Sequence, residues 1–372
     1  MTRTNGLRYL PELDGLRALA VAVVVAAHAG LPLTGGNGVT VFFVISGYLI
    51  TALLLAEHAR SGGIALRGFY RRRAARLVPA LVVVLTCTVA WLVVVGVPFR
   101  QWAYGLLGSL TYTTNILDAA APDRVDTYFE YTWSLAVEEQ FYLLWPAVLL
   151  LVLRRARSRR RALIALCLGG MLGSWAFRLL MIATRASDKT LAFSLPSHLD
   201  ALALGALIAV LTAPSLRDGR ATRSCRVRRW GAVLRGKPLV HLGRLSYGLY
   251  LWNMLCTNVF REATGVKPVH GGWWAMMWLL ALLSIAELSH RIVEEPLRRR
   301  WSEPLDRDGR RRRDRHAGFE EIPYGVGHSA VHPACGVPDT GKYGCLREPV
   351  RESEPVPRRQ EAGNGGHSLS DR

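Results

Sequence analysis

Long apolar runs alternate with short polar segments along the first 297 residues of the chain. An α-helix of about 20 mostly apolar residues crosses a bilayer core of about 30 Å. The pattern therefore predicts an all-α fold, a polytopic transmembrane helical bundle of about 8–10 membrane helices. The apolar runs lie at about 16–33, 39–56, 78–97, 133–153, 162–184, 191–212, 239–260 and 272–294.

Basic connecting segments orient these spans, because Lys and Arg concentrate on the cytoplasmic side of membrane proteins. Eight spans with a cytoplasmic N-terminus put every basic segment inside and the acidic loop around 118–130 outside. A full span at 102–117 would put the basic segment 154–161 outside, so this stretch is predicted to be a re-entrant or interfacial helix. The chain is expected to be a multi-pass protein of the cell membrane with both termini in the cytoplasm.

Composition changes after residue 297, where the chain becomes rich in Arg, Pro, Gly, Glu and Ser and loses its apolar period. Such sequence buries too little apolar surface to offset its chain entropy. The pattern predicts a cytoplasmic segment at 1–8, a membrane domain at 9–297 and a disordered basic tail at 298–372. The net charge of +19 favours membrane lipids over nucleic acid as partners. The six Cys show no paired spacing, which predicts neither a disulfide framework nor a metal site.

Charged residues inside the first apolar run are candidates for chemistry, since a charge in a bilayer is costly. Asp14 and Arg17 are three positions apart and can pair at the membrane edge. Arg17 and His28 are eleven apart, on one helix face and roughly 16 Å apart along the axis. Arg17 then marks the cytoplasmic mouth, and His28 is either an interhelical hydrogen-bonding residue or a proton acceptor near neutral pH.

An arginine cluster follows the second run, in the segment FYRRRAARLVP. A positive-inside anchor explains its charge, but does not explain why every basic residue in it is Arg. The guanidinium group offers a planar, bidentate fork for phosphate. Arg72, Arg73 and Arg76 are therefore candidate ligands of a phosphate-bearing molecule on the cytoplasmic side.

Two further polar groups enter the membrane in later runs. Ser134, Glu138 and Tyr142 recur every four residues and share one helix face, and Glu139 adds a second carboxylate. Thr132 or Ser134 is alternatively explained as a helix cap. Two carboxylates entering a bilayer are harder to explain structurally, so Glu138 is a candidate to orient a base or to bind hydroxyl groups. His198 and Asp200 form a second polar pair within an apolar run. They are two residues apart and thus lie on different helix faces.

Six strings in order across residues 9–297 resemble the membrane acyltransferase-3 family. They are ELDGLRALAV, VFFVISGYLIT, FYRRRAARLVPAL, TWSLAVEEQFYLLWP, LDALALGALIA and LGRLSYGLYLW. The resemblance implies an enzyme that moves an acyl group, commonly acetyl from acetyl-CoA, onto a hydroxyl of a surface glycan, lipid-linked sugar or secreted metabolite. Acyl-CoA would be a substrate, with no permanently bound cofactor.

The same resemblance implies roles for residues of this chain. Arg17 and His28 match the family's catalytic pair, Arg73 and Arg76 its RxxR motif, and the SLAVEEQ string contributes Ser134, Glu138 and Glu139. Family members often have His at the position of Asn253, and have further spans where this chain has only the segment 213–238.

The resulting hypothesis is an integral membrane O-acyltransferase in which His28 is the base and Glu138 or Asp14 assists it. Arg17, Arg73, Arg76 and Arg72 bind the donor; Ser134, Glu139, Tyr142, His198 and Asp200 bind the acceptor. Two alternatives stay open: a transporter or flippase for a lipid-linked glycan, and a non-catalytic relic of the family. Consumption of acyl-CoA by the purified protein would distinguish the O-acyltransferase from both alternatives.

Overall fold

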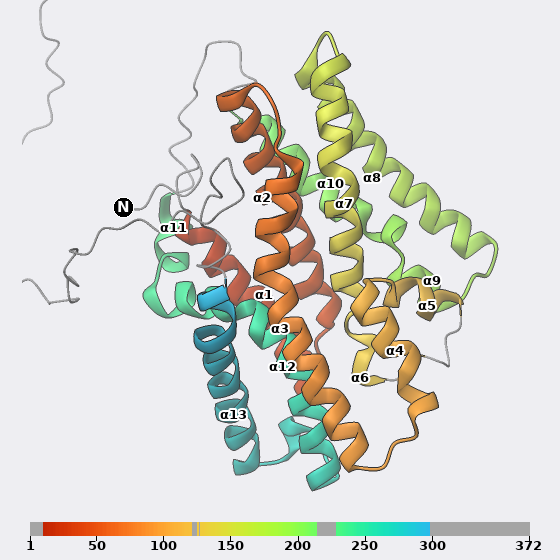
Figure 1. The fold of residues 1–372 in the computed structure, drawn as a ribbon, viewed down its shortest axis with the longest axis vertical. Coiled ribbons are helices and arrows are strands. Elements are labelled where there is room, and N and C mark those ends of the chain that lie inside the picture. Colours follow the sequence, from red (N-terminus) through yellow and green to blue (C-terminus); the bar gives the residue numbers. More distant parts are fainter. Residues whose placement is uncertain (1–9, 121–124, 126, 214–227, 298–372) are drawn as a thin grey trace, which may run out of the picture. The chain divides into compact units, whose positions relative to one another are not determined.

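The computed structural model describes residues 10–120, 125, 127–213 and 228–297 (Figure 1). Every regular element in this part of the chain is helical. The predicted segments 1–8 and 298–372 lie outside the described residues. The elements are α1 (Pro11–Ala29), α2 (Gly35–Ser61), α3 (Leu66–Val94), α4 (Phe99–Thr111), α5 (Thr114–Ala120), α6 (Thr127–Glu130), α7 (Trp133–Arg155), α8 (Arg159–Ala183), α9 (Asp188–Phe193), α10 (Leu195–Thr212), α11 (Arg228–Leu234), α12 (Lys237–Thr264), η3 (Pro268–His270), α13 (Trp273–Ser289) and the π-helical turn η4 (His290–Glu294).

Each of the eight predicted spans falls on one of the long helices. Six of these, α2, α3, α7, α8, α10 and α13, belong to helical stretches that are long and apolar enough to cross a membrane. The stretches are Gly35–Ser61, Leu66–Val94, Tyr128–Arg155, Arg159–Ala183, Asp188–Thr212 and Trp273–Leu297. The other two are α1, with 19 residues, and α12, with 28 residues. Both carry polar side chains that line the interior of the bundle. The prediction of an all-α membrane bundle is confirmed.

The ambiguous stretch at 102–117 forms no single long helix. It is divided between α4, of 13 residues, and α5, of 7 residues. Tyr112 separates them with a left-handed backbone (φ 55°). A 13-residue helix is about 20 Å long, shorter than the bilayer core. This stretch therefore contains no single helix long enough to cross the bilayer core, and its re-entrant or interfacial placement stays a prediction.

Contacts between α2 and α7 show that these two helices run in the same direction. Ser46 of α2 donates a hydrogen bond to Glu138 of α7. One to two turns further along both helices, Trp145 Nε1 donates to Thr51 Oγ1 at 2.8 Å. The predicted alternation of spans makes the second and fourth parallel, and the order of these contacts agrees with it.

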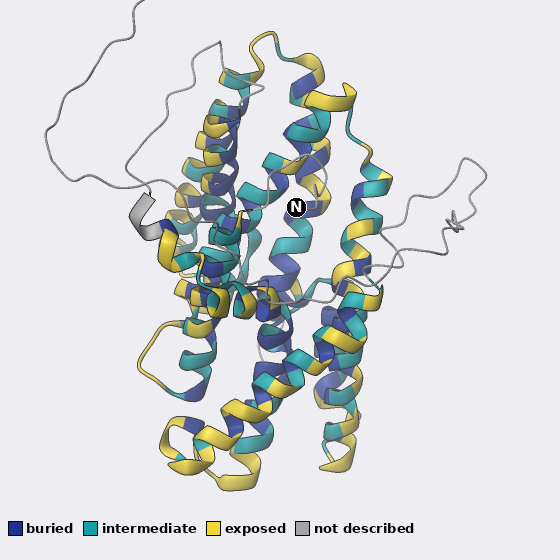
Figure 2. Ribbon diagram, turned by 90° about the vertical axis from the view of Figure 1, so that its left-hand side faces the viewer, coloured by how far each residue is buried: buried dark blue, intermediate teal, exposed yellow. Residues whose placement is uncertain are grey.

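Two apolar clusters form the interior of the described bundle. One is built mainly by α1, α3, α12 and α13, and the other by α2, α7, α8 and α10. Tyr250 packs against both. Figure 2 shows buried positions on the inward faces and exposed ones on the outside. Exposed apolar side chains such as Trp175, with 61% of its surface accessible, lie on α8. Such a surface suits contact with lipid chains.

An ion-pair network joins three short helices, α5, α6 and α9. Lys189 of α9 lies 3.1 Å from the carboxylate of Asp118 on α5 and 3.0 Å from that of Glu130 on α6. Burial raises the pKa of Asp118, and the neighbouring Lys189 opposes that effect. The predicted acidic loop therefore packs against a basic residue far along the chain.

Candidate functional site

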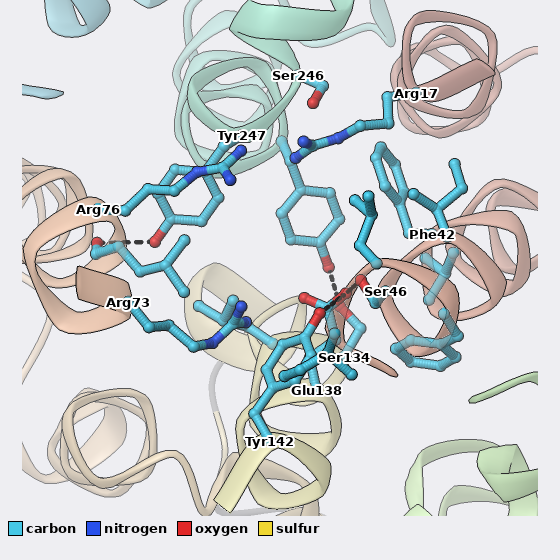
Figure 3. Close-up of a pocket in the computed structure, with 18 of the residues that line it drawn as sticks. Arg17, Phe42, Ser46, Arg73, Arg76, Ser134, Glu138, Tyr142, Ser246 and Tyr247 are labelled. Carbon is cyan, nitrogen blue, oxygen red and sulfur yellow. Dashed lines mark hydrogen bonds between the residues drawn. The ribbon is translucent and has the colours of Figure 1, made fainter. Parts of the chain in front are cut away.

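A cavity of about 160 Å³ lies where the two apolar clusters meet (Figure 3). Its walls come from α1, α2, α3, α7 and α12. Phe42, Phe43 and several aliphatic side chains of α2 form its apolar part. Six residues singled out from the sequence line it: Arg17, Arg73, Arg76, Ser134, Glu138 and Tyr142.

Arg73 is held firmly in one wall of the cavity. It donates to Glu139 from Nε at 2.8 Å and from Nη2 at 2.6 Å, a two-pronged ion pair between α3 and α7. Its guanidinium carbon also lies 3.2 Å above the centre of the Tyr142 ring. A stacked, bidentate guanidinium is rigid, and a lysine could not reproduce both contacts.

Glu138 lies one residue from Glu139 and therefore points elsewhere, into the cavity. Its Oε1 accepts hydrogen bonds from Ser46 and from the Tyr142 hydroxyl, the latter at 3.4 Å. The spacing of four residues between Glu138 and Tyr142 sets them on one helix face, as the sequence predicted. Glu138 is thus a hydrogen-bond acceptor at the cavity wall.

A chain of hydroxyls crosses from α7 to α12 beside Glu138. The Tyr250 hydroxyl donates to the carbonyl oxygen of Tyr131 at 2.7 Å, which uses its only hydrogen. The hydrogen bond between Ser134 and Tyr250 must then be donated by Ser134. Another cavity tyrosine, Tyr247, donates to the carbonyl oxygen of Leu77 at 2.8 Å. These donors are engaged with protein acceptors.

His28 does not line the cavity but lies further along α1. Its Nδ1 is hydrogen-bonded to the carboxamide of Asn253, which is fully buried. Thr257, one turn further on α12, donates to Asn253 Oδ1 at 3.4 Å. Nε2 of His28 has no hydrogen bond within the described ranges. The neighbour that orients His28 is therefore Asn253, whereas Glu138 bonds to Ser46 and Tyr142.

Four more candidate residues lie outside the cavity lining. Asp14 sits where α1 meets α12, its carbonyl oxygen against Gly243. Arg72 faces Glu57 at 3.9 Å, and its side chain is 41% exposed. The other two are His198 and Asp200, which the structure separates.

The pair on α10 diverges because its members lie on different helix faces. His198 packs on the rings of Trp133 and Phe43 and contacts the carbonyl oxygen of Ala192 at 2.7 Å. Asp200 pairs instead with Arg178 of α8 at 2.9 Å. No cluster of three or more His, Cys, Asp or Glu able to hold a metal ion occurs among the residues that the structure describes.

Other polar residues of the cavity were not singled out from the sequence. Ser46, Ser246, Tyr247 and Tyr250 line it. Single hydroxyls within apolar runs are common in membrane helices and satisfy themselves locally, so they carry little signal. Asn253 stood out as a departure from the family pattern, and in the structure it contacts His28.

Removal of one partner of the Arg73–Glu139 pair should destabilise the fold. The two side chains are only 20% and 19% exposed, so Glu139→Ala leaves a largely buried guanidinium without its carboxylate. We expect a loss of about 3 kcal/mol, measured by unfolding of the detergent-solubilised protein. The double variant Arg73→Met/Glu139→Leu should recover much of this loss. If its loss equals the sum of the losses measured for Arg73→Met and Glu139→Leu made singly, the pair is not coupled as the geometry indicates.

Comparisons with known proteins agree with this architecture. Residues 10–186 match the family model described as an acyltransferase domain. The peptidoglycan O-acetyltransferase OatA of Listeria monocytogenes is 30% identical over 350 residues, covering 78% of this chain and 56% of that protein. YrhL of Bacillus subtilis, a candidate peptidoglycan O-acetyltransferase, is 30% identical over 357 residues, covering 80% and 56%.

The chain thus spans little more than half the length of these curated relatives. No solved structure matches it. The matched domain, from α1 to the end of α8, contains both the first-span charges and the arginine and glutamate motifs of the cavity. On this match, together with the ordered motifs, the chain belongs to the acyltransferase-3 family of membrane proteins.

Proposed function

We propose that this chain is a membrane O-acyltransferase that transfers an acyl group, acetyl in the simplest case, from acyl-CoA to a hydroxyl of a cell-surface glycan, lipid-linked sugar or secreted metabolite. The observation that carries the proposal is the cavity into which three arginines and one carboxylate converge inside a membrane bundle. Similarity to peptidoglycan O-acetyltransferase OatA favours a glycan acceptor and an acetyl group.

The arginine side of the cavity is the proposed donor site. Arg17 from α1 and Arg73 and Arg76 from α3 would bind the phosphates of CoA, for which guanidinium groups are well suited. Arg73 is already paired with Glu139, so its contribution would be a fixed positive charge rather than a mobile arm. Arg72 lies outside the cavity lining, faces Glu57 and would contribute only through its charge.

His28 is the proposed general base. It lies about 16 Å from Arg17 along α1, a separation that an extended pantetheine arm could cover. Nε2 would take the proton of the acceptor hydroxyl while the oxygen attacks the thioester carbonyl. The carbon–sulfur bond then breaks, and the CoA thiolate takes the proton from the imidazolium. Nε2 accepts a proton only when Nδ1 carries one. The structure sets the amide nitrogen of Asn253 against Nδ1, so this tautomer requires the Asn253 carboxamide to turn its oxygen toward His28 and its nitrogen toward Thr257.

The glutamate side of the cavity is the proposed place for hydroxyl groups of the acceptor. Glu138 accepts from Ser46 and Tyr142, and a carboxylate has further lone pairs for a sugar hydroxyl. Ser134 and Tyr250 lie beside it. Asp14, His198 and Asp200 do not line the cavity and would act indirectly, as parts of the surrounding structure.

Release of free thiol from acetyl-CoA by the purified protein tests the proposal. We expect release only when a hydroxyl acceptor, such as a soluble peptidoglycan fragment, is present, with the acetyl group recovered on that acceptor. Protein that is well folded but releases no thiol with any glycan, lipid-linked sugar or small alcohol would contradict it. Movement of a lipid-linked glycan across vesicles without thiol release would point to a transporter instead.

A further inference from the structure

Most polar groups on the cavity wall are already satisfied by the protein. Arg73 is paired with Glu139, and Glu138 accepts from Ser46 and Tyr142. Ser134, Tyr247 and Tyr250 donate to neighbours, as described above. A ligand gains little from donors that must first give up a protein partner. The donors that remain available therefore indicate where a ligand binds.

Ser246 of α12 is one of these available groups. Its side chain lines the cavity, it is only 1% exposed, and its Oγ has no hydrogen-bond partner within the described part of the chain. A buried hydroxyl without a partner costs about 1–3 kcal/mol. A serine in this position is therefore explained if a bound ligand supplies the missing partner.

Arg17 is the second available group. Its guanidinium lines the same cavity, and it forms no hydrogen bond and no ion-pair contact within 4 Å among the described residues. It acts on the Glu138 carboxylate only through longer-range attraction. A membrane-embedded arginine is costly unless an anion compensates its charge. A negatively charged ligand in the cavity would compensate the charge of Arg17.

The crossing of α1 and α12 places Arg17 and Ser246 at the same height along the two helices. A Cβ on Gly243 would lie 1.9 Å from the carbonyl oxygen of Asp14, so the two backbones touch there. The contact between His28 and Asn253 further along shows that the helices are parallel. Arg17 and Ser246 each follow this crossing point by three residues, nearly one turn. Figure 3 draws both on the same side of the cavity.

We propose that Arg17 and Ser246 together bind one phosphate group of the donor, with the guanidinium supplying charge and the serine hydroxyl supplying a hydrogen bond. This inference rests on the proposed function and adds Ser246 as a ligand-binding residue. The phosphate would satisfy both groups at once, since phosphate oxygens accept hydrogen bonds from arginine and hydroxyl donors alike. Arg76 lines the same cavity and would add charge.

Binding of acetyl-CoA and of inorganic pyrophosphate to Ser246→Ala tests the inference. We expect dissociation constants for both to rise about 10-fold, because a hydrogen bond to a charged group is lost. Ser289→Ala is the matched control: its hydroxyl is also buried without a partner, but it lies on α13 outside the cavity lining. This control should bind both ligands like the wild type.

A double-variant cycle with Arg17→Gln separates a shared phosphate from two independent contacts. If both residues hold one phosphate, Ser246→Ala should weaken binding much less in the Arg17→Gln background than in the wild type. Unchanged affinity of Ser246→Ala, or wild-type protein that does not bind pyrophosphate, would overturn the subsite. The thiol-release assay remains a separate test, so failure of the subsite and failure of the proposed function are distinguishable.

Discussion

Gly243→Ala is expected to destabilise the bundle by about 3 kcal/mol and to lower acyl transfer by about 10²-fold. The added Cβ would lie 1.9 Å from the Asp14 carbonyl oxygen and 2.4 Å from its carbon. Both are backbone atoms, so no side-chain rotation relieves the clash, and α1 must move away from α12. That displacement separates Arg17 from Ser246 and His28 from Asn253, and small misplacements of reacting groups are costly.

Gly173→Ala is the matched control for this prediction. Gly173 lies within α8, where an added Cβ meets nothing within 4 Å. Alanine is the better helix former by up to about 1 kcal/mol, so this variant should be as stable as the wild type or slightly more stable. Thermal unfolding in detergent and thiol release measure both variants. If Gly243→Ala keeps the wild-type midpoint and rate, α1 and α12 do not pack as closely as described.

The membrane helices could be predicted because the bilayer imposes a length and a polarity on each of them. The run at 162–184, for example, matches α8, Arg159–Ala183, to within three residues at the start and one at the end. Helices with polar faces extend beyond their apolar runs: the run at 16–33 predicted the first span, but α1 begins at Pro11. Its first turns carry Asp14 and Arg17, whose charges break the apolar run although the helix continues through them.

The pairing of helices could not be predicted, because it depends on contacts between residues far apart in the chain. Gly243 touches Asp14, and Asn253 binds His28, across more than 200 residues. A glycine in a helix has no local signature that tells a close crossing from an open surface. The sequence therefore predicted that Arg17 and His28 share a helix without predicting which helix faces them.

The cavity was predicted in part, and the reason lies in the kind of residue. Charges such as Arg73 and Glu138 stand out in apolar runs because burial makes them costly. Hydroxyls such as Ser246 do not stand out, although this one lines the cavity and is a buried donor without a partner among the described residues. His198 and Asp200 stood out equally, but they pack against aromatic rings and Arg178 respectively. Polarity in a membrane run identifies candidates, and only the packing assigns them to a site.

His28→Ala is expected to lower acyl transfer by about 10²–10⁴-fold, the usual contribution of a general base. The protein should still insert and fold, since His28 is only half-buried and Asn253 keeps its contact with Thr257. Binding of acetyl-CoA should change little, because His28 lies outside the cavity lining that carries the arginines. The expected pattern is a fall in the maximal rate of thiol release with an almost unchanged dissociation constant for the donor.

His28→Asn separates loss of the base from loss of packing. An asparagine places a polar atom near the position of Nδ1 and can still bond to the Asn253 carboxamide, but it cannot take up a proton. It should therefore be as inactive as His28→Ala while matching the wild type in thermal unfolding. His270→Ala, at an exposed histidine of η3, controls for the loss of an imidazole and should keep full activity. If His28→Asn transfers acetyl groups at the wild-type rate, His28 is an interhelical hydrogen-bonding residue, and another group must accept the proton.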